Sequence, residues 1–436
     1  MRPFKNKHGQ VKASTGRRAA ALLALAAAAF LCSGARAESI KISCGAVGRE
    51  LEQCREAAQA WARKTGNQVQ VVATPNDSSE RLALYEQVLS SGSDKIDVFQ
   101  VDVVWPGLLG SHFIDLRPYT HGAEQQMFPD FVAADTKDGR LVAMPWFINA
   151  GLLFYRKDLL AKYGLAVPET WAALAQDARR VQEAERAAGN DKMWGYVWQG
   201  RAYEGLTCDA VEWLASYGGG AIVERDGRIS VNNPRAAAAL RTAASWVGDI
   251  SPAAVLNYAE EESRGVFQAG NAVFMRNWPY AWSLAQAAQS SIRGKVGVAV
   301  LPATATGPHS ATLGGESLAV SRYSRYPALA ADLVMYMTSA AVQKQRAIGS
   351  SFNPSLLALY KDADVLAANP FMGELYPVFT HAVSRPAVSA GTRYNQVSNE
   401  FWNAAHDVLS HRAKAEDALA ELAATLERVS RGGKWN

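Results

Sequence analysis

The sequence predicts an α/β protein with two lobes, and two observations lead to this expectation. Short apolar strands alternate with helices at the start of the chain: Ile40–Cys44, Gln68–Thr74 and Ile96–Val101 are strands, and Glu50–Gly66 and Ser78–Leu89 are helices. This alternation is typical of βαβ units and a mainly parallel sheet. In addition, the roughly 399 residues after residue 37 are too many for one ordinary hydrophobic core, so we expect two lobes.

Strands and helices continue through the rest of the chain. Gly66 ends the first long helix, because glycine readily adopts the left-handed conformation at a helix C-terminus. Pro234 after Asn232-Asn233 is typical of a helix start. The further strands expected are Leu141–Pro145, Gly151–Tyr155, 194–198, Val273–Asn277, Val296–Leu301 and Leu318–Ser321, and the main further helices are Thr170–Ala188, Asp209–Ser216, Pro234–Ile250, Glu261–Gly270 and Ala413–Val429.

Residues 1–37 are predicted to be a cleaved signal peptide. Basic residues precede the apolar run Ala19–Leu31, and Ala35–Ala37 supplies a small-residue cleavage site. The run is shorter than the roughly 20 apolar residues that span a bilayer. A lipoprotein anchored at Cys32 is less favoured, because Leu31 stands where a small residue is expected. We therefore expect a periplasmic protein.

The positive charge of the whole chain belongs to this leader. The leader holds seven basic residues and no acidic ones, so its removal leaves 38 of the 45 Lys and Arg against 41 Asp and Glu. The net charge changes from +4 to −3, and this disfavours a nucleic-acid partner. Three cysteines remain. Cys44 and Cys54 are candidates for a disulfide in an oxidising compartment, whereas Cys208 is expected to be a buried small hydrophobe.

The segment 194–220 is rich in groups that suit a sugar. An aromatic strand (Trp194, Tyr196, Trp198) leads into a glycine-flanked loop with Tyr203 and Glu204. Flat aromatic faces beside groups that form paired hydrogen bonds suit a ligand with apolar patches and many hydroxyls. The alternative, that these aromatic residues are ordinary core, stays open.

Polar residues also follow the predicted strands, where open α/β sheets bind their ligands. Glu50, Arg81, Asp102 and Asn149 occupy such places. Carboxylates and guanidinium groups each grip two neighbouring hydroxyls in planar geometry. The aromatic group 277–282, with Trp278 and Tyr280, directly follows another strand. These positions predict a binding cleft.

No motif for a catalytic nucleophile, a metalloprotease, a phosphate loop or a dinucleotide site is present, and the His residues are scattered. We therefore expect a binding protein with no cofactor and no metal. The alternative is a secreted glycoside hydrolase that uses a carboxylate pair, such as Asp102 with Glu204 or Glu316, because the spacing of such a pair is set by the fold.

Several motifs resemble those of one family, and they span about residues 40 to 425. They are Asp97–Trp105, Ala150–Leu159, 194–219, Phe274–Trp282, Gly294–Ala299 with Leu301–Pro302, Ala311–Gly315 and Ala382–Pro386. The chain resembles the extracellular solute-binding protein family 1, the maltose-binding-protein-like class, and especially its trehalose/maltose-binding branch.

The resemblance implies a type II periplasmic-binding-protein fold with a ligand cleft between the lobes. The N-terminal lobe is expected to comprise 38–146 plus 302–350, and the C-terminal lobe 147–301 plus 351–436. The resemblance also implies a monomer that binds a disaccharide, closes by a hinge motion and delivers the sugar to the permease of an ABC importer. Which sugar binds is left open.

The resemblance further implies roles for matching residues. Glu50, Arg81, Asp102 and Arg385 match positions that hold sugar hydroxyls. Trp278 and Tyr280 match the platform for a glucose ring, and Gly314 and Gly315 match positions where the backbone approaches the sugar. Two residues depart from the branch: Asn149 stands where Asp is frequent, and Glu316 stands where Trp follows the glycine pair. Tyr203 and Glu204 complete the expected ligand-binding set.

Overall fold

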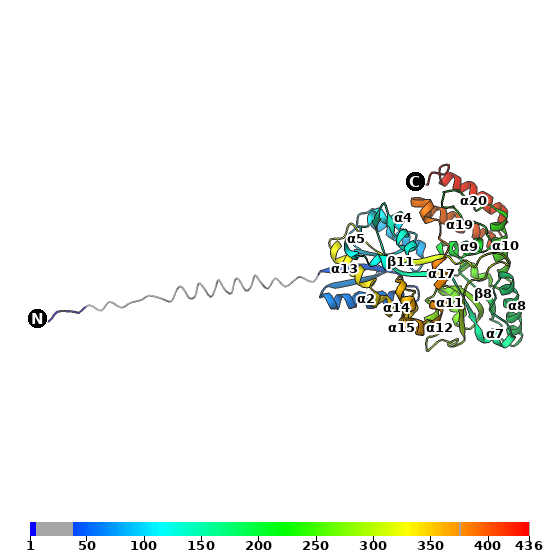
Figure 1. The fold of residues 1–436 in the computed structure, drawn as a ribbon, viewed down its shortest axis with the longest axis horizontal. Helices are drawn as coiled ribbons and strands as arrows, with labels where there is room; N and C mark the ends of the chain where they lie inside the picture. The colour runs from blue at the N-terminus through cyan, green and yellow to red at the C-terminus, as the bar shows by residue number, and fades with distance from the viewer. Residues whose placement is uncertain (6–37, 375, 436) are drawn as a thin grey trace.

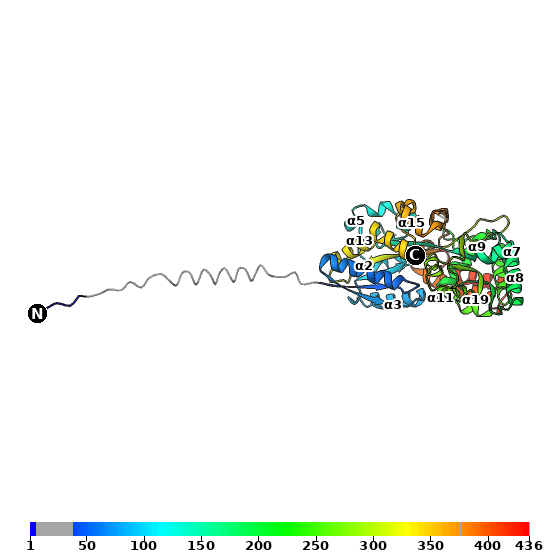
Figure 2. The ribbon, with the colours of Figure 1, turned by 90° about the horizontal axis from the view of Figure 1, so that it is seen from below.

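The computed structural model describes residues 1–5, 38–374 and 376–435, so most of the predicted signal peptide lies outside the described residues. Two lobes lie side by side (Figures 1 and 2). In Figure 1 the blue, cyan and yellow segments form most of one lobe, and the green and red segments form most of the other. This confirms the predicted α/β fold with two lobes.

The first lobe contains a five-stranded sheet. Its strands, in spatial order, are β2 (Gln68–Ala73), β1 (Ser39–Cys44), β3 (Val98–Asp102), β11 (Leu313–Val320) and β6 (Met144–Ala150). The main helices of this lobe are α2 (Glu50–Thr65), α3 (Ser78–Ser90), α13 (Pro327–Met337) and α14 (Ala340–Ser350).

The second lobe contains a four-stranded sheet. Its order is β10 (Val296–Ala299), β7 (Leu152–Arg156), β9 (Ala272–Asn277) and β8 (Trp194–Val197). The main helices here are α8 (Trp171–Ala187), α9 (Glu204–Ser216), α10 (Pro234–Trp246), α11 (Glu260–Gln268), α19 (Tyr394–Leu409) and α20 (Ala415–Val429). Within the described ranges, no helix combines the length and the apolar character needed to cross a bilayer.

Both sheets are mixed, and in this respect they differ from the expected mainly parallel sheets. In the first sheet β1 pairs in parallel with β2 and β3, but β11 is antiparallel to β3 and β6. In the second sheet β8 and β9 are parallel, whereas β7 is antiparallel to β9 and β10. The reason lies in the connections. Parallel pairs follow helical crossovers, whereas β11 enters the first sheet on the chain's return from the second lobe.

The chain first passes between the sheets at Gly151. This residue separates β6 in the first sheet from β7 in the second. A Cβ atom there would lie 2.0 Å from the Oε1 atom of Glu212, so this tightly packed crossing requires glycine. The exact division into 38–146 plus 302–350 and 147–301 plus 351–436 stays a prediction.

Local sequence signals place two helix N-termini at the edge of the first sheet. Helix α3 begins after Asp77, whose Oδ1 accepts hydrogen bonds from the backbone N–H groups of Ser79 and Glu80 at 2.8 and 3.2 Å. Helix α2 has Glu50 and Glu52 in its first turn and ends at Gly66 with φ of 75°. These helix starts bring Glu50 and Arg81 to the sheet edge.

Asp135 is a buried carboxyl in the core of the first lobe, and it predicts a pH-dependent stability. Its Oδ2 accepts a hydrogen bond from the Ser317 hydroxyl at 2.6 Å, and its Oδ1 has no hydrogen-bond partner. Burial raises the pKa of Asp135 to about 8. The native state therefore binds a proton that the unfolded chain releases at a pH of about 4. Its contribution to stability is complete below that pH and is lost as the pH rises toward 8.

We expect Asp135→Asn to gain stability relative to the parent as the pH rises from 5 to 8, with a slope approaching about 1.4 kcal/mol per pH unit. Urea unfolding at a series of pH values measures this difference. Asp130→Asn is the control, because Asp130 lies in α6 (Pro129–Ala134), the helix that Asp135 caps at its C-terminus, and is exposed. Parallel pH profiles for the parent and Asp135→Asn would contradict the prediction.

Candidate functional site

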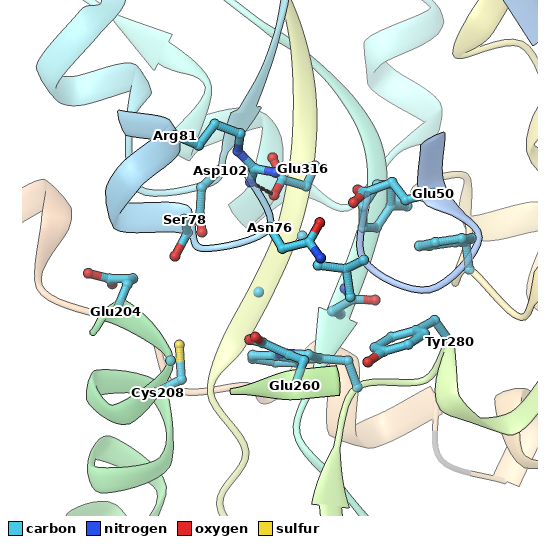
Figure 3. Close-up of a pocket in the computed structure, with 18 of the residues that line it drawn as sticks. Glu50, Asn76, Ser78, Arg81, Asp102, Glu204, Cys208, Glu260, Tyr280 and Glu316 are labelled. Atoms are coloured by element: carbon cyan, nitrogen blue, oxygen red, sulfur yellow. Dashed lines mark hydrogen bonds and ion pairs between the residues drawn. The ribbon is translucent and has the colours of Figure 1, made fainter. Parts of the chain in front are cut away.

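A cavity with about 650 Å³ of empty space, including its mouth, lies between the two lobes. Figure 3 shows Arg81, Asp102 and Glu316 on one wall, and Glu260, Tyr280 and Cys208 on the other. The lining residues are Val47, Glu50, Asn76, Ser78, Arg81, Asp102, Phe147, Asn149, Glu204, Gly205, Cys208, Glu260, Trp278, Tyr280, Gly314, Gly315, Glu316, Phe352 and Arg385.

The fold brings eleven of the twelve residues expected to bind ligand to the wall of this cavity. They are Glu50, Arg81, Asp102, Asn149, Glu204, Trp278, Tyr280, Gly314, Gly315, Glu316 and Arg385. Tyr203 is the one expected residue that does not line the cavity. Its ring is buried beneath Gly205, where a Cβ atom would lie 2.1 Å from the Tyr203 hydroxyl oxygen. Tyr203 thus supports the wall from behind.

Arg385 joins the two lobes through two carboxylates. Its Nη2 donates to Asp102 Oδ1 on the first sheet at 2.7 Å, and its Nη1 donates to Glu204 Oε1 at the start of α9, also at 2.7 Å. The Arg385 side chain is 1% exposed. Glu204 also accepts hydrogen bonds from the hydroxyls of Tyr394 and Ser398. Burial raises the pKa of Glu204, and the positive charge of Arg385 opposes this shift.

A second ion pair, Arg81 with Glu316, lies at the edge of the first sheet. The Arg81 guanidinium donates to Glu316 Oε1 and lies over the Trp105 ring, with Cζ 5.2 Å from its centroid. Glu316 stands directly opposite Asp102 in the antiparallel pairing of β11 with β3. Burial, reinforced by the charges of Asp102 and Glu50, raises the pKa of Glu316 to about 8, although Arg81 opposes the shift.

Some polar atoms of the lining have no hydrogen-bond partner in the protein. Glu316 Oε2 and Asn149 Oδ1 are unpaired acceptors, and the Nε atoms of Arg81 and Arg385 are unpaired donors. Buried polar atoms without partners are costly.

Trp278 is the aromatic surface best placed to meet a ligand. It is half-buried, and the Arg276 guanidinium lies over its ring with Cζ 3.9 Å from the centroid. Arg276 is itself held by Asp209 at 2.7 Å and Glu212 at 2.6 Å. The Trp278 indole N–H donates to Glu260 Oε1 at 3.3 Å. These contacts hold the orientation of the ring.

Tyr280 is more deeply buried than Trp278, at 3% exposure. Its hydroxyl donates to Glu261 Oε1 at 2.7 Å. Its ring packs closely against Gly48 of the first lobe, where a Cβ atom would lie 2.5 Å from Tyr280 Cδ2. Tyr280 therefore contacts both the cavity and the opposite lobe.

Gly315 has a φ of +132°, which side chains rarely allow. A Cβ atom at this position would also lie 2.4 Å from the carbonyl oxygen of Phe147. Neighbouring Gly314 faces the Trp278 ring, with its ideal Cβ position 3.1 Å from Trp278 Cζ3. The glycine pair thus lets strand β11 approach Trp278 and β6 closely.

The disulfide between Cys44 and Cys54 closes the loop that carries Glu50 and Val47. The two cysteines are ten residues apart. The loop-closure model gives such a short loop a stabilisation of about 2.5–3 kcal/mol. We expect the double variant Cys44→Ala with Cys54→Ala to lose about this much free energy of unfolding, measured by urea unfolding. A reductant should lower the melting temperature of the parent and leave that of the variant unchanged; equal responses would contradict the prediction.

The aromatic strand at 194–198 belongs to the core and does not line the cavity. Tyr196 and Trp198 are fully buried, and Trp198 meets Trp213 edge-on with ring centroids 5.1 Å apart. In segment 194–220, the residues that reach the cavity are Glu204, Gly205 and Cys208. The interpretation of the aromatic strand as a sugar surface was therefore wrong. Tyr196 packs against Trp246 of α10 and Trp198 against Trp213 of α9, while Trp194 lies under Arg186 of α8.

The structure adds lining residues that sequence reasoning missed. Asn76 and Ser78 follow β2, so the rule that ligands bind at strand ends identifies them in retrospect. Phe147, Phe352 and Glu260 carry no comparable local signal, because tertiary packing brings them to the cavity.

The comparison with known families identifies the chain. Residues 48–344 match the model of the bacterial extracellular solute-binding proteins. The chain belongs to this family. The match confirms the resemblance drawn from the motifs.

Relatives of the solute-binding protein span nearly its whole length. A probable ABC transporter-binding protein of Deinococcus radiodurans is 50% identical over 418 residues, which are 95% of this chain and 99% of the relative. The maltose-bound structure of MalE3 from T. maritima superposes with a TM-score of 0.86 at 38% identity, covering 90% of this chain and 100% of that one. A tagatose-bound solute-binding protein from Thermotoga lettingae has a TM-score of 0.80 at 22% identity, covering 90% and 99%, and supports the fold alone.

The solute-binding protein is not an enzyme, and the hydrolase alternative is wrong. Its family and its relatives are binding proteins. The carboxylates considered for hydrolysis are also engaged elsewhere: Asp102 and Glu204 share Arg385, and Glu316 pairs with Arg81.

Proposed function

We propose that this protein captures a disaccharide outside the cytoplasm and delivers it to the membrane permease of an ABC importer. One observation carries the proposal: the interlobe cavity combines the Trp278 ring with carboxylates and guanidinium groups from both lobes. A sugar has apolar ring faces and many hydroxyls, and this combination matches both.

The ligand roles follow from the lining. Trp278 and Tyr280 pack against a sugar ring, while Asp102, Arg81 and Arg385 bind its hydroxyls. Further polar contacts come from Glu50, Asn149, Glu204 and Glu316. The backbone comes close to the sugar at Gly314 and Gly315. Tyr203 supports Glu260 from behind the wall. The relatives support both parts of the proposal, because one is named an ABC transporter-binding protein and MalE3 is bound to maltose.

Transport requires that sugar binding be linked to closure of the lobes. A ligand that contacts both lobes binds the closed form better than the open form, so it shifts the population toward closure. Arg385 already contacts one carboxylate from each lobe, Asp102 from the first and Glu204 from the second. The permease then recognises the closed monomer. Cleavage after residue 37 releases the protein into the periplasm.

A thermal-shift screen tests the proposal. The purified protein is heated with trehalose, maltose, sucrose, palatinose, glucose and sugar alcohols. A ligand that binds the folded state alone stabilises it by about 2.7 kcal/mol at one hundred times its Kd, so its melting temperature rises. We expect one disaccharide to produce the largest rise without being consumed. A flat response to all saccharides would refute the proposal.

A further inference from the structure

The cavity lining is more acidic than basic. Five carboxylates line it, from Glu50, Asp102, Glu204, Glu260 and Glu316, against the two guanidinium groups of Arg81 and Arg385. Because burial raises the pKa of Glu316 to about 8, the other four carboxylates set against the two guanidinium groups leave a formal excess of two negative charges at neutral pH. Buried charges are costly unless they are paired. A bound ligand either offsets part of this negative charge or leaves it uncompensated.

The two guanidinium groups are already occupied. Arg385 binds both Asp102 and Glu204, and Arg81 binds Glu316. Burial raises the pKa of Glu50. The positive charge of Arg81, a hydrogen bond from Gln100 Nε2 at 2.6 Å and the positive charge of buried Arg346 oppose this shift. Asp102, Glu204 and Glu316 are thus each paired with an arginine. Glu50 lies near two arginines, Arg81 and Arg346.

Glu260 differs from the other four. Its Oε1 accepts a hydrogen bond from the neutral Trp278 indole at 3.3 Å, and in the described part of the chain no Lys or Arg lies within ion-pair distance of it. Burial raises the pKa of Glu260, and the Tyr203 hydroxyl and the charge of Arg276 oppose this shift. The Arg276 guanidinium is itself held by Asp209 and Glu212 at 2.7 and 2.6 Å. Glu260 thus faces the cavity as a carboxylate without a direct cationic partner.

Unpaired acceptors also lie on the opposite wall. Glu316 Oε2 and Asn149 Oδ1 are buried without a hydrogen-bond donor. Glu316 also stands opposite Asp102 in the strand register, which places two carboxylates close together. Figure 3 shows Glu260 and Glu316 on opposite sides of the same space. A ligand in this space lies between these two acidic side chains.

We propose that the preferred ligand is a disaccharide that carries one protonated amine, such as an amino-sugar disaccharide, with the ammonium bound on the side of Glu260. This inference rests on the proposed function, since it names the chemical class of sugar for the same cavity. An ammonium group supplies several donors and a positive charge, whereas a hydroxyl supplies one donor and no charge. An ammonium donor also attracts the carboxylate as an opposite charge, which a hydroxyl donor does not.

Calorimetric titration with matched sugars tests the inference. The probes are trehalose and maltose, their monoamino-deoxy analogues with the amine at different ring positions, and the N-acetyl derivative of each amine. We expect at least one amine to bind about tenfold more tightly than both its parent sugar and its neutral N-acetyl derivative. The N-acetyl derivative keeps the position of the nitrogen and removes its charge.

Variants then locate the contact. Glu260→Gln should remove most of the preference for the amine over the parent sugar, and Glu52→Gln, an exposed change on α2 outside the cavity, should keep it. If neutral trehalose or maltose binds as tightly as every amine, the inference is wrong and the proposed function stands. If no saccharide of either kind binds, the proposed function fails as well. A preference for the amine that survives Glu260→Gln would overturn the assignment to Glu260.

Discussion

Arg385→Met is expected to lower the free energy of unfolding by about 3–5 kcal/mol, because it leaves the carboxylates of Asp102 and Glu204 without their shared cation. Both oxygen–nitrogen distances are 2.7 Å, and the Arg385 side chain is 1% exposed. Methionine keeps much of the apolar volume, so the loss reports mainly the charge. Urea unfolding of the ligand-free protein measures it.

The pH dependence separates this electrostatic role from simple packing. Without Arg385, protonation of Glu204 relieves part of the buried negative charge, so the loss of stability should be smaller at pH 5 than at pH 8. Arg179→Met is the matched control, because its ion pair with Asp249 is exposed, at 46% and 40%, and should contribute at most about 1 kcal/mol. Equal losses for the two variants, or a loss at Arg385 that does not vary with pH, would contradict the ion-pair account.

Trp278→Ala is expected to weaken binding of the sugar found in the thermal-shift screen by about 10- to 100-fold, or about 1.4–2.7 kcal/mol. The reason is the loss of the aromatic surface that packs against the sugar ring. The half-buried ring is held by Arg276 at 3.9 Å, so it meets the ligand with little loss of side-chain freedom. Calorimetric titration of the parent and the variant measures the change.

Trp282→Ala provides the control for this prediction. Trp282 lies four residues further along and packs edge-on against Phe371 with ring centroids 5.7 Å apart, but it does not line the cavity. Its removal should lower the melting temperature and leave the affinity within about twofold. An unchanged affinity for Trp278→Ala would show that the sugar platform lies elsewhere, with Phe147 and Phe352 as the next candidates.

Much of the candidate site was predictable because the carboxyl ends of neighbouring strands meet at one edge of a sheet. Asp102 is the last residue of β3 and Glu50 follows β1, and both line the cavity as expected. The same rule identifies Asn76 and Ser78. Phe352 and Glu260 were not predictable, since neither follows a strand and both reach the cavity through the packing of distant segments.

The aromatic strand at 194–198 shows the limit of composition as evidence. Its alternation correctly predicted a strand, because side chains of a strand point to opposite faces with a period of two. Alternation does not say whether the aromatic face meets solvent, ligand or a helix. Trp198 and Tyr196 are buried under helices that begin after the strand ends, and this packing is not encoded in the local pattern.

The sequence by itself determined the order of strands and helices, the family, and the placement of the main polar residues at strand ends. These follow from local periodicity, helix caps and motifs, which act over a few residues. The tertiary structure alone decided that β11 returns antiparallel between β3 and β6 and places Glu316 beside Asp102. It also decided that Arg385 joins Asp102 to Glu204, which lie 283 and 181 residues from it in the chain. Such pairings depend on how the two lobes pack, because contacts between distant residues arise when buried surfaces meet.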